Sequence, residues 1–236
     1  MTRASAANFY ERIADRFEGL DHPADVRRRL SVVFDECLGG VSLANARVLD
    51  AGCGYGVFSA AAARRGATVV SVDIGPRLVA LARARGGGHG VVADACRLPA
   101  RDNSFDVVIA SEMLEHTLAP ARAVEELARV VKLGGILVIT TPNRAWQPIV
   151  RLASRLRLRP FQGVENFVGW DELDRACVAA GLDVELHQGF HPWPFHLGFA
   201  GAAARVERRL ADTRAARLMV NQAMVGRKVR RPRDAA

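Results

Sequence analysis

The sequence predicts an α/β protein in which a doubly wound, mostly parallel sheet is covered by helices on both faces. Two observations lead to this prediction. Short apolar, β-branched runs alternate with helical stretches, and the first run leads into a glycine-rich turn. Half of the 236 residues are apolar, which is enough to fill the core of a single domain over 1–236.

The predicted elements follow in a regular order along the chain. Two amphipathic helices are expected within 5–38, and we assign 1–38 to an N-terminal helical lid. The expected strands are residues 47–50, 68–73, 90–94, 105–110, 136–141, 182–188 and 220–229. The expected helices are residues 56–66, 76–85, 119–132 and 170–180. Two insertions interrupt this order, and we expect them to form a helical cap over residues 143–166 and 190–217.

Composition limits the classes of partner and location. The formal net charge of +8 permits anionic partners or a membrane surface. We expect no nucleic-acid partner, because the place after the fourth strand lacks an aromatic-proline tetrapeptide such as Asn-Pro-Pro-Tyr. The four cysteines are scattered without a C-x-x-C pair, which indicates reduced thiols and a cytoplasmic location. No apolar run reaches the ~18 residues of a membrane span. Nothing in the sequence predicts an oligomeric state.

The first strand ends in an acid and a run of glycines, in the motif VLDAGCGYG. Glycines let the backbone turn tightly and approach a ligand closely, as in nucleotide-binding turns. Asp50, at the end of the strand, would repel the pyrophosphate of a dinucleotide. S-adenosylmethionine (SAM) fits better, because it carries an amino group, a sulfonium and an adenosine but no phosphate.

Polar residues also end the next three strands of the predicted sheet. Asp50, Asp73, Asp94 and Ser111 occupy the four strand ends in order. Ligands of open α/β sheets bind at the carboxyl ends of the strands. Any one of these acids could be a helix cap or a turn residue. Together they predict one ligand site at this edge of the sheet.

These segments resemble the class I SAM-dependent methyltransferases, in particular the type 11 small-molecule group. The resemblance covers residues 46–142 through VLDAGCGYG, VVSVDIG, VVADACRLP, SFDVVIASEMLEH and VKLGGILVITTPN. It implies a Rossmann-like, seven-stranded sheet whose last strand runs antiparallel to the rest. It also implies SAM as cofactor, S-adenosylhomocysteine (SAH) as product and a small-molecule acceptor.

The resemblance implies roles at the methionine end of SAM. Asp50 is expected near the ammonium, together with the backbone of Gly52, Cys53 and Gly54. Ser111 is expected to line the pocket near the sulfonium.

The resemblance also implies roles around the adenosine. Asp73 is expected to accept both ribose hydroxyls, and Ile74 to pack on the adenine. Asp94 is expected to accept the adenine amino group, with Ala95 beside the ring. Carboxylates accept charge-assisted hydrogen bonds from such donors.

His116 is the candidate catalytic base. It follows the fourth strand, and an imidazole with an ordinary pKa near ~6.5 can remove a proton at neutral pH. The alternative is that His116 only orders the loop. Glu112, Glu115 and His116 also form E-x-x-E-H, which could hold a divalent ion. We assign no metal ligand, because the motif also occurs without metal.

The acceptor is expected to be a hydroxyl of a hydrophobic, phenolic or quinone-like compound. N- or C-methylation, or SAM binding without catalysis, remain alternatives. Residues 146–161 combine an apolar stripe with arginines and no acid, which is typical of a helix lying in a membrane interface. An amphipathic insertion stands at the same place in ubiquinone-biosynthesis O-methyltransferases. This stretch is therefore expected to contact a membrane peripherally, or else to cover the substrate site.

Overall fold

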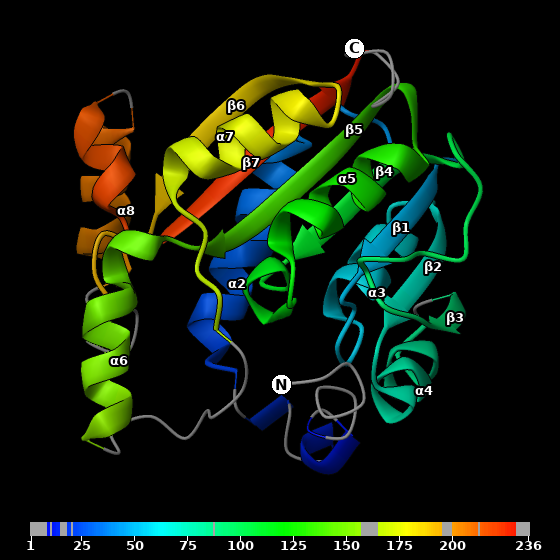
Figure 1. The fold of residues 1–236 in the computed structure, drawn as a ribbon, viewed down its shortest axis with the longest axis horizontal. Coiled ribbons are helices and arrows are strands. Elements are labelled where there is room, and N and C mark those ends of the chain that lie inside the picture. The colour runs from blue at the N-terminus through cyan, green and yellow to red at the C-terminus, as the bar shows by residue number, and fades with distance from the viewer. Residues whose placement is uncertain are drawn as a thin grey trace.

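The computed structural model describes residues 9, 11–14, 18–19, 21–86, 88–156, 165–194, 200–211 and 213–229. Its centre is a seven-stranded sheet in the order β3-β2-β1-β4-β5-β7-β6 (Figure 1). The strands are β1 (Arg47–Ala51), β2 (Thr68–Asp73), β3 (His89–Val92), β4 (Phe105–Ser111), β5 (Val131–Pro142), β6 (Leu182–Phe190) and β7 (Asn221–Lys228).

The predicted doubly wound sheet is confirmed, including the direction of its strands. β1 to β5 pair in parallel, and β7 runs antiparallel between β5 and β6. Every strand except β2 differs from the prediction at one or both ends, as β3 and β5 illustrate. β3 ends at Val92, and Asp94 instead forms an isolated bridge with Arg97. β5 begins at Val131, because Val131 pairs with Phe105 across a bulge in the ladder.

Helical segments connect and cover the strands. They are α2 (Pro23–Ser31), η1 (Val32–Cys37), α3 (Val57–Ala63), α4 (Pro76–Ala84), η2 (Leu114–His116), α5 (Pro120–Val130), η3 (Arg144–Trp146), α6 (Gln147–Arg155), α7 (Trp170–Ala179), α8 (Ala200–Leu210) and η5 (Arg214–Leu218). A proline stands in the first turn of α2, α4, α5 and α6, where its missing N–H costs nothing.

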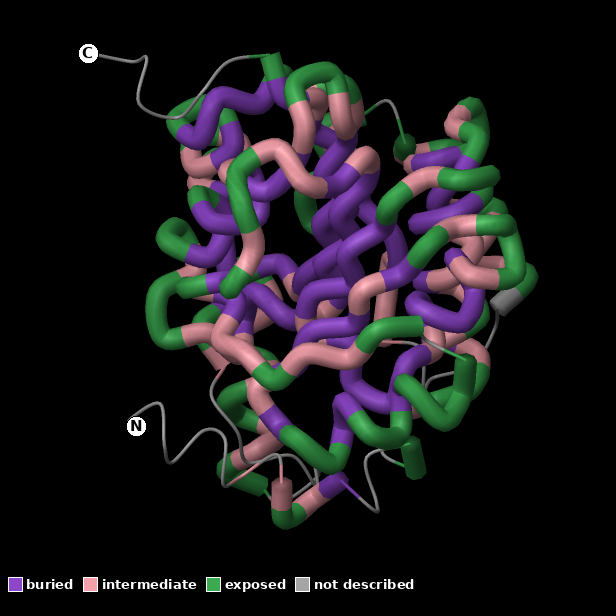
Figure 2. Tube along the Cα trace, turned by 90° about the vertical axis from the view of Figure 1, so that its right-hand side faces the viewer, coloured by how far each residue is buried: buried purple, intermediate pink, exposed green. Residues whose placement is uncertain are grey.

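Successive residues of each central strand point to opposite faces of the sheet, and both faces are buried. On one face Leu49 and Val108 pack with Leu127 of α5 and Leu173 of α7. On the other face their neighbours, such as Val48, belong to a second cluster with residues of η1 and α3. Figure 2 shows this buried centre between exposed outer segments. The continuous apolar runs of the sequence therefore reflect burial on both faces.

Ion pairs join α2 to the C-terminal insertion. Arg28 lies 2.7 Å from Glu207 of α8, and Asp25 lies 2.9 Å from His191 after β6. Arg29 pairs with Asp25 at 2.8 Å. These charges are largely buried, and each has an opposite charge beside it, as burial requires. The contacts hold two segments together that are far apart in the sequence.

Lys228 is buried at the far end of the sheet from the carboxyl ends of the parallel strands. Its Nζ donates to Asn103 Oδ1 at 3.0 Å and to the carbonyls of Arg129 at 2.9 Å and Val131 at 2.8 Å. All three ammonium hydrogens therefore have acceptors, which explains how a lysine with 2% exposure is tolerated.

Candidate active site

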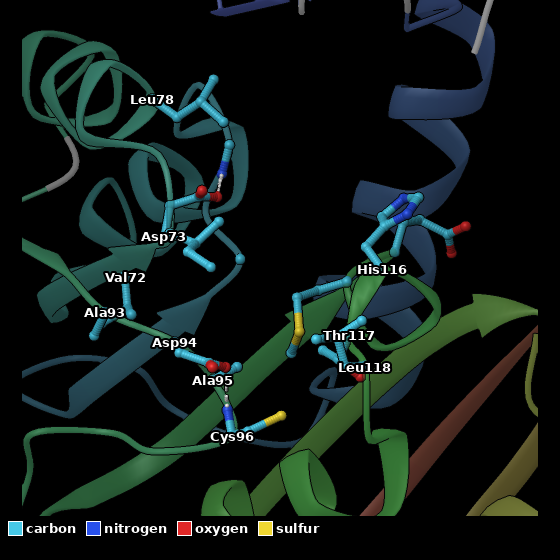
Figure 3. A pocket seen from close by; sticks show the side chains of 15 residues that line it. Val72, Asp73, Leu78, Ala93, Asp94, Ala95, Cys96, His116, Thr117 and Leu118 are labelled. Atoms are coloured by element: carbon cyan, nitrogen blue, oxygen red, sulfur yellow. Dashed lines mark hydrogen bonds between the residues drawn. The ribbon is translucent and has the colours of Figure 1, made fainter. Parts of the chain in front are cut away.

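One cavity opens at the carboxyl ends of the parallel strands. Its enclosed volume is about 110 Å³, and the empty space including its open mouth is about 790 Å³. Seven of the residues predicted from the sequence line it: Gly52, Gly54, Asp73, Ile74, Asp94, Ala95 and His116. Figure 3 shows His116 across the cavity from Asp73 and Asp94. Segments far apart in the sequence thus meet at this edge of the sheet.

The glycine-rich turn forms the floor of the cavity. Gly52 has a φ of +74°, and a Cβ on it would lie 2.2 Å from Cγ of Met113. Both the left-handed backbone and the close approach therefore require glycine at this position. The amides of Gly52 and Cys53 donate to the carbonyl of Val72 at 2.8 and 2.9 Å, which fixes the turn against β2.

Asp73 joins the ends of two strands at the cavity wall. Its Oδ2 accepts from the amide of Gly54 at 3.0 Å, and its Oδ1 accepts from the amide of Gly75 at 2.9 Å. Burial raises the pKa of Asp73. The backbone amides of Gly75, Gly54 and Ile74 oppose this rise by hydrogen bonding, and the carboxylate, which can accept about four hydrogen bonds, keeps capacity for a ligand. Asp94 accepts from the amide of Cys96 at 2.8 Å.

Asp50, Cys53 and Ser111, also predicted from the sequence, are buried but do not line the cavity. Asp50 lies beneath the turn, where Oγ of Ser59 donates to its Oδ2 at 2.5 Å. Burial raises the pKa of Asp50 to about 6. The hydroxyl of Ser111 is hydrogen-bonded with that of Thr140 at 2.8 Å.

His116 stands beside a buried carboxylate on η2. Its Nε2 lies 3.7 Å from Oε1 of Glu115, whose Oε2 accepts from Oγ1 of Thr141 at 3.0 Å. Burial raises the pKa of Glu115 to about 7. Burial and the neighbouring Glu115 raise the pKa of Glu112 to about 8. The two carboxyls can therefore hold or release protons near neutral pH.

The two carboxyls of the E-x-x-E-H motif are held by contacts within the protein. Across the described ranges, the structure contains no group of three or more His, Cys, Asp or Glu residues arranged to hold a metal ion. Glu112 is instead bound through Oε2 to Nδ2 of Asn221 at 2.8 Å.

The sequence reasoning missed much of the cavity wall. Glu112 was considered only as a metal ligand, although its place directly after Ser111 at a strand end was a usable signal. The other unpredicted lining residues are Val72, Leu78, Ala93, Cys96, Met113, Thr117 and Leu118. Most of them are apolar, and they give the cavity a hydrophobic wall.

The helix expected over 146–161 is observed as η3 and α6, and residues 157–161 lie outside the described part of the chain. No residue of α6 is buried. Ile149, Leu152 and Leu156 are 54%, 57% and 60% exposed. The described helices include none long and apolar enough to cross a membrane.

Comparisons with known proteins identify related methyltransferases. A family model described as a methyltransferase domain matches residues 49–139. The ubiquinone biosynthesis O-methyltransferase of Xanthomonas oryzae pv. oryzae is 36% identical over 214 residues, which cover 81% of this chain and 90% of that protein. The protein of the same name from Xylella fastidiosa is 36% identical over 168 residues, which cover 65% of this chain and 68% of that protein.

Solved structures share the fold at low sequence identity. Magnesium protoporphyrin IX methyltransferase from Synechocystis, solved with bound SAH, has a TM-score of 0.69 and 15% identity, covering 96% of this chain and 100% of that one. The [4+2]-cyclase SpnF has a TM-score of 0.70 and 20% identity, covering 97% of both chains.

Proposed function

Because this chain belongs to the SAM-dependent methyltransferase family and acts on a small molecule, we propose that its acceptor is a hydroxyl of a hydrophobic, phenolic or quinone-like compound. The relative from Xanthomonas oryzae, named for O-methylation in ubiquinone biosynthesis, supports this acceptor class. The observation that carries the proposal is that His116 shares one cavity with the strand-end carboxylates and the apolar Met113 and Leu118.

The residues of the cavity fit SAM, with SAH as the product. The Gly52 turn forms a cradle that any side chain would fill. Asp73 lines the cavity and would accept the ribose hydroxyls, and Ile74 adds apolar surface for the adenine. Asp94 would accept the adenine amino group, with Ala95 beside the ring.

The neighbouring buried residues complete this assignment. The backbone of Cys53 and Gly54 would hold the methionine end of SAM from the turn. Ser111, hydrogen-bonded with Thr140, would lie behind the wall near the sulfonium. Asp50 supports the turn from below through Ser59.

SAM supplies an activated methyl group, so the protein mainly has to align the acceptor and move one proton. We assign proton removal from the acceptor hydroxyl to an imidazole nitrogen of His116. Oε1 of Glu115, 3.7 Å from Nε2 of His116, would stabilise the imidazolium that results. Met113 and Leu118 give this part of the cavity an apolar lining.

The N-terminal region 1–38 is proposed to act as a lid, with residues 143–166 and 190–217 as the cap. Phe9 and Ile13 pack against Leu78 and Ile74, which both line the cavity. This contact supports a lid over the adenosine side. In contrast, Val32 to Leu38 contribute buried residues to the packing on the sheet.

Incubation of the protein with methyl-labelled SAM and an extract of its source organism tests the acceptor class. We expect label to enter the organic phase, and the His116→Ala variant to transfer far less. Label confined to the aqueous phase would reject a hydrophobic acceptor and favour N- or C-methylation of a polar metabolite. Binding of SAM without transfer to any fraction would favour a non-catalytic role.

We also propose that α6 contacts an anionic membrane surface. Ile149, Leu152 and Leu156 form one exposed apolar face, and the exposed Arg151 and Arg155 flank it. An amphipathic helix of this kind binds through apolar burial and attraction to anionic headgroups. Figure 1 places α6 at the margin of the molecule, away from the sheet.

Sedimentation with phosphatidylglycerol vesicles tests this contact. Replacing Ile149, Leu152 and Leu156 by serine should abolish binding at low salt. Serine replacements at Leu133 and Val178, which are 55% and 48% exposed on other elements, serve as the matched control. Equal binding of both variants would reject the role of α6. This experiment does not test the predictions of a cytoplasmic location and of no nucleic-acid partner.

A further inference from the structure

Glu112 occupies an unusual backbone position directly after β4. Its φ is +51°, in the left-handed region that residues other than glycine rarely adopt. Its amide donates to the carbonyl of Thr140 at 2.8 Å, which holds the residue in this conformation. Such conformations persist where the surroundings impose them, and they cluster at ligand sites.

The side chain of Glu112 is only half satisfied. Oε2 accepts from Asn221 Nδ2 at 2.8 Å, whereas Oε1 is buried without a hydrogen-bond partner. Within the described residues, no other buried side-chain oxygen or nitrogen is in this state. The hydroxyl of Thr140 is hydrogen-bonded with Ser111, and its proximity to the Glu112 carboxyl lowers the pKa of Glu112, but it does not reach Oε1 with hydrogen-bond geometry. A buried oxygen without a donor is costly, so its retention calls for an explanation.

Glu112 lies next to the turn that is expected to hold the methionine end of SAM. It lines the cavity together with Met113. Met113 packs so closely on the turn that a Cβ on Gly52 would come within 2.2 Å of its Cγ. The segment that carries Glu112 therefore faces the glycine-rich turn directly.

Asp50, which the sequence analysis places beside the ammonium of SAM, is less available for that contact. Asp50 does not line the cavity, and its Oδ2 is already bound by Ser59 at 2.5 Å. Glu112 is thus a better-placed acceptor for a cationic donor than Asp50.

The charge around Glu112 also favours a cation. Burial and Glu115 raise the pKa of Glu112 to about 8, while Arg29 opposes that rise. Arg29 is already engaged, at 2.8 Å from Asp25 and 3.1 Å from Asp21. Three carboxyl groups, those of Asp21, Asp25 and Glu112, therefore lie around the single guanidinium of Arg29. An ammonium group entering the cavity would supply both the missing charge and up to three N–H donors.

We propose that Oε1 of Glu112 accepts a hydrogen bond from the α-ammonium of SAM, the role that the sequence alone assigns to Asp50. This inference rests on SAM being the cofactor. Such a charge-assisted contact would complete the hydrogen bonding of the Glu112 side chain.

Calorimetry with two ligands tests the proposal without relying on turnover. SAH carries the ammonium, whereas 5′-methylthioadenosine has the same adenosine and thioether but no amino-acid group. In Glu112→Gln the side-chain oxygen should turn toward Asn221, so the amide would point its N–H groups at the ammonium. We expect the affinity for SAH to fall about 10- to 100-fold. The affinity for methylthioadenosine should stay within about 2-fold, since it lacks the group that Glu112 binds.

Two controls use other buried carboxylates. Asp50→Asn and Glu115→Gln should change the affinities for both ligands by the same factor. If Glu112→Gln fails to fold, Glu112→Asp keeps the charge but withdraws it by one methylene, and it should show the same selective loss for SAH.

Three outcomes would overturn the proposal. They are equal losses for both ligands in the Glu112 variants, no loss for either ligand, and a loss selective for SAH in Asp50→Asn instead. If the unaltered protein bound neither ligand, the cofactor assignment itself would fail.

Discussion

The close approach of Gly52 to Met113 allows a quantitative test of the glycine-rich turn. In Gly52→Ala the new Cβ would lie 2.2 Å from Cγ and 2.6 Å from Cβ of Met113. Carbon atoms in contact prefer about 3.5–4.0 Å, so the turn or Met113 must move by more than about 1 Å. Overpacking of this kind costs about 1–3 kcal/mol. The left-handed backbone, at a φ of +74°, adds about 1–2 kcal/mol for alanine.

Gly134→Ala provides a matched control, because it has the same backbone strain without the clash. Gly134 has a φ of +76°, and a Cβ there would meet nothing within 4 Å. It lies near the start of β5, away from the cavity. Gly134→Ala should therefore lose only the backbone contribution, about 1–2 kcal/mol, and keep its affinity for SAM.

Urea unfolding and SAM calorimetry on the two variants measure the difference. We expect Gly52→Ala to be about 1–3 kcal/mol less stable than Gly134→Ala, and to bind SAM at least about 10-fold more weakly. Equal stability of the two variants, with normal SAM binding in both, would refute the steric requirement for glycine at position 52.

Three further predictions concern protons and buried charge. In His116→Asn, kcat should fall about 10²- to 10⁴-fold while calorimetry shows unchanged SAM affinity; a normal kcat would reject proton removal by His116. Lys228→Met should lower the free energy of unfolding in urea by about 1–3 kcal/mol, because the buried carbonyl of Val131 and Oδ1 of Asn103 lose the donor that Lys228 supplies; SAM affinity should not change. The raised pKa values of Glu115 (about 7) and Glu112 (about 8) mean that the folded state holds their protons more tightly than the unfolded state. Their contribution to stability is therefore complete below about pH 4.5 and is lost as the pH rises through about 7 and 8, so urea midpoints of the apoprotein should fall over that range, and less so in Glu112→Gln.

Sequence reasoning located most of the sheet, because the signal for a doubly buried strand is local. β2 was predicted at its observed limits, and the antiparallel direction of β7 followed from the family resemblance. The errors lie where a tertiary contact extends or ends a strand. β5 reaches back to Val131 through pairing with Phe105, which no periodicity in 131–135 announces.

In the candidate site, too, local patterns were predictable from the sequence and tertiary contacts were not. Gly52, Asp73 and Asp94 could be placed at the cavity because strand ends and glycine turns have recognisable sequence patterns. Whether a strand-end acid faces the cavity or lies beneath it depends on side-chain partners. Asp50 is drawn to Ser59, nine residues further along the chain, and nothing in the motif itself specifies that contact.

The proposed cap is held by contacts between residues that are far apart in the sequence and follow no regular pattern. Asp25 and His191 are separated by 166 residues, yet they form a buried pair that fixes α2 against the C-terminal insertion. Such pairs hold the C-terminal insertion in place, whereas the cavity is built from adjacent strand ends. The sequences of the strand ends and of the C-terminal insertion can therefore change independently. The similar fold of a [4+2]-cyclase fits this view, since a shared sheet does not impose a shared reaction. The acceptor of this enzyme should accordingly be sought through variants in the cap and in Met113 to Leu118, while changes at Asp73, Asp94 and Glu112 should report on SAM alone.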